Sequence, residues 1–442
     1  MSSSLARKHS LHSLIMFALP NMVMMIFMSL YVIVDGMFIS RFVGTDALSA
    51  TNMVYPAQSI EMATAIMVAT GGSAIIARKL GEGKPDEAKG DLSFLVLVET
   101  VLGILTAIVG VVFCDKIIYL LGASEAQFEM CRLYQRTLFW FAPFFFLQTA
   151  FQVFFITAGK PGLGLIVTVA AGVANVVLDY IFMVPLGMGI RGAAIATGIG
   201  YFIGAVSGVI YFAVAKNGSL CFTSPRRDFK MLLQACSNGS SEMVTNLSNA
   251  VTTFLFNYTF LKFFGEDGVA SITIILYFQF VFTAVFFGYS NGVAPIISFK
   301  YGSGDAPQLK TVFKNSLLFV VVCSVLSYAL SQLSISTILT FFTPRDSSVY
   351  SITMSGFYIY SFGFLLMGTS IYASAHFTAL SDGAVSAIIS FARTFIFLIG
   401  SILILPYVLG ETGVWLSVPV AELLGIIISI LFLAIKRKKY RY

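Results

Sequence analysis

The sequence predicts an all-α integral membrane protein with twelve transmembrane helices, arranged as two six-helix lobes that a parallel internal repeat relates. Hydrophobic residues make up 57% of the 442 residues and charged residues only 11%, with a mean hydropathy of +0.88. This is more apolar surface than a soluble core buries. The chain also offers twelve apolar runs, each close to the roughly 20 residues that a helix needs to cross a hydrocarbon core of about 30 Å.

The repeat is the most specific of these observations. Residues 42–89 align without a gap with residues 263–310, an offset of 221, and 12 of the 48 pairs are identical. The offset still holds downstream, where Pro185 meets Pro406 and Gly192 meets Gly413. Each half carries six helices, an even number, so both halves enter the membrane from the same side and the repeat is parallel.

The apolar runs place the helices in order. We expect helices at residues 13–40, 48–77, 91–113, 134–158, 163–187, 190–215, 231–262, 267–298, 311–338, 350–376, 381–407 and 412–435. Arg7 and Lys8 precede the first run as they would in a signal peptide, but no small-residue cleavage pattern follows, so this run is a retained first helix. Charged residues recur between Cys114 and Leu133, which predicts an amphipathic outer segment at the membrane interface.

The same pattern divides the chain into domains. We expect an N-lobe of six transmembrane helices at residues 1–215, a cytoplasmic linker at 216–230, and a C-lobe of six transmembrane helices with a basic cytoplasmic tail at 231–442. On one side of the predicted helices the loops and termini carry 19 lysines and arginines, and on the other side they carry 7. This bias predicts that both termini are cytoplasmic. The tail from Lys436 then meets anionic lipid, and a nucleic-acid partner is not expected.

Charged residues deep within the predicted spans are candidates for a site, because a charge near the bilayer centre usually faces a cavity or a partner. They are Asp35, Glu61, Glu99, Asp179, Arg393 and Glu422. Asp35 and Asp179 share a depth in the predicted topology and form a plausible pair. Tyr31 and Asn175 each lie four residues before one of these acids, on the same helical face. Together they could hold a proton or a small hard cation, although each aspartate could instead hydrogen-bond a broken helix backbone.

The second half lacks these acids. At the repeat offset, Asp35 becomes Phe256 and Asp179 becomes Gly400, so an ion site of this kind belongs to the N-lobe alone. Structural and functional roles stay open for three glutamates, any of which could pair with Arg393 inside the bundle: Glu61, Glu99 and Glu422. Four glutamines are candidates for a substrate cavity, with interhelical hydrogen bonding as the alternative role: Gln148, Gln152, Gln58 and Gln279.

Enzyme chemistry is not expected. Residues 288–292 spell a nucleophile-elbow pattern around Ser290, but they lie inside an apolar helix without the strand and turn that this motif needs. His376 lies near the predicted cytoplasmic end of its helix, so a serine and histidine pair at the predicted outer depth is not expected. The five cysteines show no spacing typical of a metal or redox site, and we expect no cofactor and no catalytic residue.

In these residues the chain resembles a multidrug and toxic compound extrusion (MATE) transporter over essentially its full length, nearest to the bacterial branch typified by a staphylococcal multidrug exporter. The matching features are Leu19 and Pro20, the run from Val34 through Asp35 to Gly44, the loop at 81–89, Ala158 and Gly159, Asn175 with Asp179 leading to Pro185, Gly189 and Gly192, and Ser241 with Glu242 at the opening of the second half.

The resemblance implies export of drugs by antiport against protons or sodium, from a cavity between the lobes. It carries the coupling site of some prokaryotic members over to Asp35 and Asp179, with Tyr31, Asn175 and Thr197 as neighbours. Other members use acids in the seventh and tenth helices; here Asn249 stands in the seventh and the tenth has no acid.

The expected partners are therefore small-molecule drugs or organic cations and the lipid bilayer of the inner (plasma) membrane, with the protein a monomer. The coupling ion is H⁺ or Na⁺, and no metal is expected beyond sodium at Asp35 and Asp179. The rival readings are a lipid-linked oligosaccharide flippase of the same superfamily, which needs a basic cavity for pyrophosphate, an intramembrane enzyme, and a passive channel.

Overall fold

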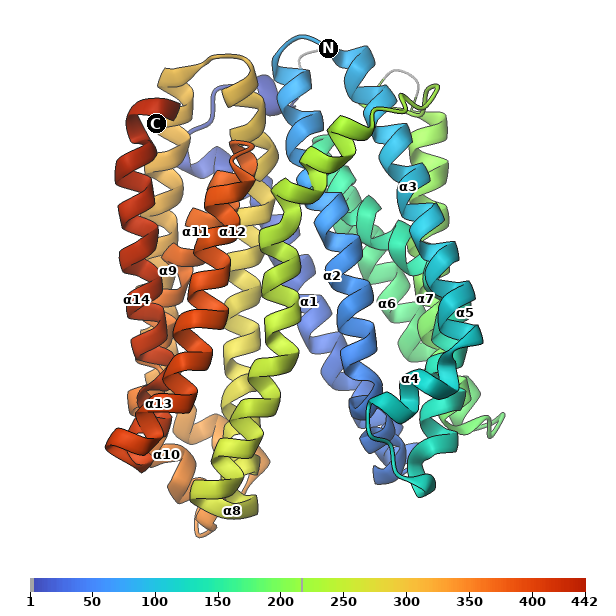
Figure 1. Cartoon of the computed structure of the whole chain (residues 1–442), viewed down its shortest axis with the longest axis vertical. Helices are drawn as coiled ribbons and strands as arrows, with labels where there is room; N and C mark the ends of the chain where they lie inside the picture. The colour runs from blue at the N-terminus through green and yellow to red at the C-terminus, as the bar shows by residue number, and fades with distance from the viewer. Residues whose placement is uncertain (1–3, 216–217) are drawn as a thin grey trace.

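A computed structural model, which describes residues 4–215 and 218–442, is helical throughout, with no strand in those ranges (Figure 1). The N-lobe comprises α1 (Leu11–Phe42), α2 (Thr45–Gly81), α3 (Pro85–Val112), α4 (Cys114–Leu120), α5 (Glu125–Thr157), α6 (Pro161–Met183) and α7 (Gly189–Val214), preceded by the short η1 (Ser4–Ala6). The C-lobe comprises α8 (Phe229–Gly302), α9 (Ala306–Phe342), α10 (Ser348–Tyr360), α11 (Phe362–Ala379), α12 (Gly383–Phe391), η2 (Ala392–Leu398), α13 (Ile399–Leu409) and α14 (Glu411–Tyr440).

The predicted fold class is confirmed. Ten of the described helices are long and apolar enough to cross a membrane, and α10 with α11, bent by 48°, makes an eleventh span. The 74-residue α8 breaks at Gly265, whose φ of 68° is not helical, and its two parts supply two of the twelve spans. Gly44, the repeat counterpart of Gly265, also has a positive φ, and it ends the first helix of the N-lobe. Each lobe therefore turns between its first two spans at a glycine.

Two details of the predicted helices are wrong. The expected interfacial segment at 114–133 is only the short α4, because α5 already begins at Glu125, nine residues before the predicted start. The first turns of α5, before the apolar run, are charged, and Arg132 there pairs with Asp115 of α4 and with Glu129. The tenth predicted helix is not continuous either, since it bends at Ser361.

The domain boundaries stay a prediction, because Lys216 and Asn217 lie outside the described residues. Both termini lie at one end of the bundle, here called the terminal end, and the ribbons of the two lobes diverge toward the opposite, far end (Figure 1).

At the terminal end the lobes meet through very close backbone contacts between α2 and the first part of α8. A Cβ atom built on Gly71 would lie 1.9 Å from the carbonyl oxygen of Ala235. A Cβ atom on Gly239 would lie 1.9 Å from the carbonyl oxygen of Met67. Glycine at both positions therefore lets the two helices approach more closely than any side chain permits.

A second pair of glycines repeats this contact at the helix ends. Gly81 faces the carbonyl oxygen of Phe299, and Gly302 faces the carbonyl oxygen of Arg78, with 2.1 Å from each built Cβ atom to the oxygen. Gly81 and Gly302 are repeat counterparts, as are Arg78 and Phe299. The contact between lobes is therefore symmetric about the repeat axis.

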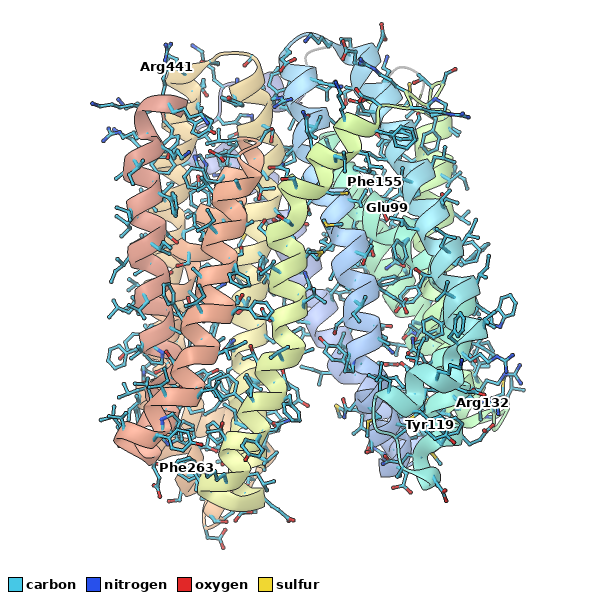
Figure 2. The ribbon with its side chains drawn as sticks, in the orientation of Figure 1. Glu99, Tyr119, Arg132, Phe155, Phe263 and Arg441 are labelled. Carbon is cyan, nitrogen blue, oxygen red and sulfur yellow. The ribbon has the colours of Figure 1, made fainter. Side chains whose placement is uncertain are left out.

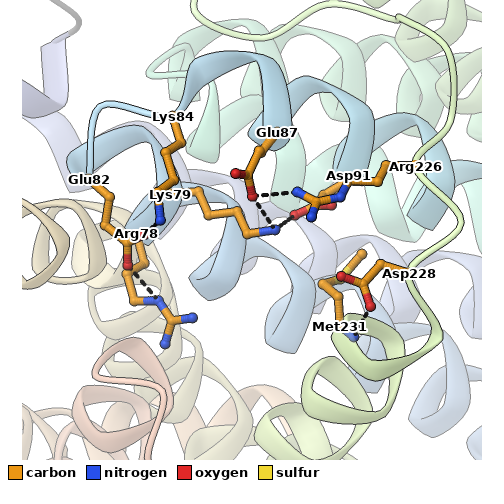
Figure 3. A network of polar contacts seen from close by, with 9 residues as sticks. All are labelled: Arg78, Lys79, Glu82, Lys84, Glu87, Asp91, Arg226, Asp228 and Met231. Atoms are coloured by element: carbon orange, nitrogen blue, oxygen red, sulfur yellow. Dashed lines mark hydrogen bonds and ion pairs between the residues drawn. The ribbon is translucent and has the colours of Figure 1, made fainter.

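A network of ion pairs fastens the segment before α8 to the N-lobe (Figure 3). Lys79 of α2 pairs with the fully buried Asp91 and, at 3.4 Å, with Glu87 of α3. Arg226 pairs with the same Glu87. Asp228 accepts a hydrogen bond from the Met231 amide at the start of α8, and this bond holds the pKa of Asp228 below its usual range.

The segment before α1 is fastened to the C-lobe in the corresponding way. Lys300, the repeat counterpart of Lys79, donates from Nζ to the carbonyl oxygen of Ala6 over 3.0 Å. The backbone N–H of His9 donates to Oε1 of Gln308 over 3.0 Å. The segment that leads into each lobe is thus held by the other lobe, and both attachments lie at the terminal end.

We expect Gly71→Ala to lower the free energy of unfolding by about 1–3 kcal/mol, because the added methyl group overpacks a backbone contact. Gly400→Ala is the matched control, since no atom lies within 4 Å of a Cβ built there. Thermal unfolding of the purified protein measures both. A Gly71→Ala protein as stable as the Gly400→Ala protein contradicts the close contact.

Lys79→Met and Arg226→Met separate the buried from the exposed part of the network. We expect Lys79→Met to cost about 3–5 kcal/mol of stability, because it leaves the Asp91 charge buried and unpaired. Arg226→Met should cost less than about 1 kcal/mol, because its pair with Glu87 is solvent-exposed. Equal losses of melting temperature in the two variants would argue against this division.

Candidate functional site

The N-lobe contains a polar cluster around the two predicted acids. Asp35 lies on α1 and Asp179 on α6, two helices that pack against each other, and their carboxyl groups are close enough to interact electrostatically. Asp179 is fully buried. Oδ1 of Asp35 and both carboxylate oxygens of Asp179 have no hydrogen-bond partner among the described residues. The helices that the sequence analysis placed at one depth thus bring the two acids together.

The predicted neighbours lie in the same cluster. Nδ2 of Asn175 donates to Oγ1 of Thr197 over 3.2 Å, which links α6 to α7. This bond leaves Oδ1 of Asn175 without a partner among the described residues. Tyr31, one turn before Asp35, lies close enough to both acids to interact with them electrostatically. The cluster therefore offers carboxylate, amide and hydroxyl oxygens from three helices.

The cluster has further members, of which Tyr134, Tyr201 and Gln135 were not predicted as site residues. Tyr134 of α5 and Tyr201 of α7 lie within electrostatic range of Asp35. Nε2 of Gln58 donates to Gln135 over 3.3 Å, and Nε2 of Gln135 donates to Glu61 over 3.4 Å. Helical spacing held part of this signal, because Tyr201 follows Thr197 by four residues and Glu61 follows Gln58 by three.

The composition of the cluster decides its chemistry. Buried polar atoms are nearly always hydrogen-bonded, so several unpartnered oxygen atoms in one place indicate a site for a ligand that oxygen atoms coordinate. Carboxylate, amide and hydroxyl oxygens suit a proton or a hard cation such as sodium. The residues present therefore fit either coupling ion.

The C-lobe has no counterpart of the acid pair at the equivalent positions. Phe256 replaces Asp35 and packs edge-to-face against Phe260 at a centroid distance of 6.2 Å. Gly400 replaces Asp179 and has open space around it. The two lobes have the same arrangement of helices but different side chains at these central positions.

The four glutamines occupy different places. Gln152 lines a cavity between the lobes and also, with Gln148, a small cavity within the N-lobe. Gln58 belongs to the polar cluster. Gln279 accepts a hydrogen bond from the Tyr360 hydroxyl inside the C-lobe. Of the four, Gln152 is the one that the structure places at the cavity between the lobes.

Arg393 pairs with Glu422, which the sequence alone did not resolve. Nε of Arg393 lies 2.9 Å from Oε2 of Glu422, and its Nη2 lies 2.7 Å from Oε1. Arg393 sits in the π-helical turn η2. Glu99 of α3 is fully buried, toward the terminal end of the N-lobe, with no partner for either carboxylate oxygen among the described residues (Figure 2).

Ser290 and His376 are both buried, and neither hydrogen-bonds the other among the described contacts. His376 instead packs between the rings of Phe313 and Tyr442, with centroid distances of 5.0 and 4.8 Å. The histidine therefore has a packing role in the C-lobe.

A family model described as MatE matches residues 20–181 and 242–403, once in each lobe. The chain belongs to the MatE family. The predicted resemblance is thereby confirmed, and the two matches of equal length lie at nearly the repeat offset. The family indicates a multi-pass membrane transporter.

Individual MatE relatives cover nearly the whole chain. The Multidrug export protein MepA of Staphylococcus aureus (strain bovine RF122 / ET3-1) is 23% identical over 432 residues, which span 96% of this chain and 93% of that protein. A crystal structure of MATE in complex with MaL6 superposes with a TM-score of 0.93 at 21% identity, covering 100% of this chain and 99% of that one. An outward-facing multidrug resistance MATE family transporter of the MOP superfamily gives 0.91 at 21% identity, covering 98% and 97%. These structures share the fold.

Breaking the buried pair in the C-lobe tests whether it is structural. We expect Arg393→Met to lower the free energy of unfolding by about 3–5 kcal/mol, because it strands the Glu422 charge. The double variant Arg393→Met/Glu422→Leu should recover most of that loss, because no charge is left unpaired. Thermal unfolding of the purified proteins measures this. A double variant less stable than the single one contradicts the pairing.

Proposed function

We propose that the protein is a cation-coupled multidrug efflux antiporter of the plasma membrane. It exports small organic compounds in exchange for protons or sodium ions, by alternating access between its two lobes. The observation that supports the coupling is the pair of carboxyl groups of the half-buried Asp35 and the buried Asp179, three of whose four oxygens are buried without a partner among the described residues. The exported class is supported by the relatives named Multidrug export protein MepA.

The proposed cycle uses the contact between the lobes. The positive-inside bias favours a cytoplasmic location for the terminal end, where glycines hold the lobes together. The described arrangement then corresponds to the state that is closed to the cytoplasm. Binding of a proton or sodium ion at Asp35 and Asp179 favours one arrangement of the N-lobe, and its release favours the other. Such a ligand shifts the equilibrium only through its different affinity for the two arrangements.

The flippase alternative is less well supported. A pyrophosphate-linked substrate requires free basic groups between the lobes. Arg393 is neutralised by Glu422, and the described lining of the cavity between the lobes contains an acid and no base. A multidrug exporter requires no such basic cavity.

Asp35→Asn and Asp179→Asn test the coupling site. In sealed proteoliposomes we expect each variant to lose at least 90% of the transport of a fluorescent lipophilic cation driven by an imposed proton or sodium gradient, because the amide cannot exchange a proton or neutralise a cation. Separate gradients identify the ion. Asp346→Asn is the matched control, since Asp346 is exposed in the loop before α10. Full gradient-driven transport by the double variant Asp35→Asn/Asp179→Asn would sink the assignment.

A further inference from the structure

A cavity lies between the lobes near the terminal end. Both lobes contribute polar side chains to it: Asn21, Thr70 and Gln152 from the N-lobe, and Glu242, Asn291 and Thr378 from the C-lobe. Met24, Met25 and Ile66 add apolar surface. The cavity is thus bounded by helices that must separate if the terminal end opens.

The lining of this cavity follows the repeat. Asn21 and Glu242 are counterparts at the 221-residue offset, and so are Thr70 and Asn291. The contacts of Gly81 and Gly302 between the lobes obey the same symmetry. The repeat axis therefore passes between these counterparts, through the cavity, as expected for a compartment that both lobes share.

The symmetry of position is broken by one charge. Glu242 is 6% exposed and is the one charged residue among the described residues that line the cavity. Its carboxylate takes part in no hydrogen bond or ion pair among the described residues; the one side-chain hydrogen bond to Glu242, from Nδ2 of Asn246, ends on its backbone carbonyl. A carboxylate in a low-dielectric site without a cationic partner is costly, and such residues are usually functional.

Asn21 supplies an independent observation. It is 1% exposed, and its Nδ2 donates to the carbonyl oxygen of Gly288 in the C-lobe over 2.6 Å. Its Oδ1 has no hydrogen-bond partner among the described residues. Asn21 and Glu242 therefore line the cavity from its two sides, and each has a side-chain oxygen that accepts no hydrogen bond among the described residues.

We propose that Glu242, with the Oδ1 atom of Asn21, binds the positively charged group of the compound that the protein exports. This inference rests on the proposed export function and names a residue that selects its substrate. The carboxylate attracts the cationic group, and the amide oxygen accepts a hydrogen bond from an ammonium or amidinium N–H. The two methionines, flexible and polarisable, accommodate apolar bodies of different shape. The preferred class is an organic monovalent cation with an apolar body.

This acid is separate from the coupling site. Asp35 follows Asn21 by fourteen positions on α1, a distance of about 21 Å along the helix. A substitution at Glu242 therefore leaves Asp35 and Asp179 intact. Substrate selection and ion coupling can be measured independently.

Two ions of the same shape and opposite charge provide the test. Tetraphenylphosphonium and tetraphenylborate are titrated into the purified full-length protein, and the dissociation constant of each is measured for wild type, Glu242→Gln, Glu242→Asp and Glu266→Gln. Glu266 is the matched control, because it lies on the same helix and is exposed near the far end. Thermal unfolding checks that each variant is folded.

We expect Glu242→Gln to weaken binding of tetraphenylphosphonium at least tenfold and to leave tetraphenylborate within threefold or improve its binding. Glu242→Asp should retain the preference for the cation, and Glu266→Gln should match wild type. An unchanged preference in folded Glu242→Gln overturns the proposal, as does an equal loss for both ions. If wild type transports neither probe under any gradient but binds the cation through Glu242, the export function fails and the binding site stands.

Discussion

The cost of leaving a charge unpaired in hydrocarbon organises this molecule. Where a charge has a partner, as in the pair of Arg393 with Glu422, it binds helices to one another. Where carboxylates lack a basic partner among the described residues, as at Asp35 and Asp179, they lie together in a polar cluster inside a lobe. Glu242 differs again, because it faces a space between lobes. The surroundings of each charge thus separate acids that pair with a base from acids that are available to a ligand, which residue type alone does not.

The two halves repeat one arrangement of helices but carry different polar residues at the centre of each lobe. Two of the glycines that bring the lobes together, Gly71 and Gly81, have glycine at the equivalent position of the other half, and a side chain at either would strike a backbone oxygen. The centres of the lobes have diverged instead. Tyr201 belongs to the acid cluster, and its counterpart Glu422 holds an arginine. Repeat symmetry therefore governs the contact between the lobes, and asymmetry assigns the proposed ion site to one of them.

Hydropathy and the repeat were enough to predict the fold, because membrane spans are defined by local composition. Helical spacing also predicted the neighbours of Asp35 and Asp179. The parts that failed depend on tertiary packing. In the sequence, three glutamates are equally possible partners for Arg393, and only the tertiary packing selects Glu422. Gln135 joins Gln58 and Glu61 only across two helices. The sequence places Glu242 near the opening of the second half. Its repeat counterpart Asn21 lies inside the first predicted helix, which already indicates an interior position for Glu242.

The paired fastenings at the terminal end have a mechanical consequence. Lys300 holds the segment before α1, and the network around Lys79 holds the segment before α8, so both crossings between lobes lie at one end. If the lobes tilt about these attachments, the helix ends at the far end move most. A 37-residue helix such as α2 is about 55 Å long. A tilt of about 10° about the terminal end therefore displaces the far end of this helix by roughly 10 Å. A small rearrangement at the attachments thus becomes a large movement at the opposite end of the lobe.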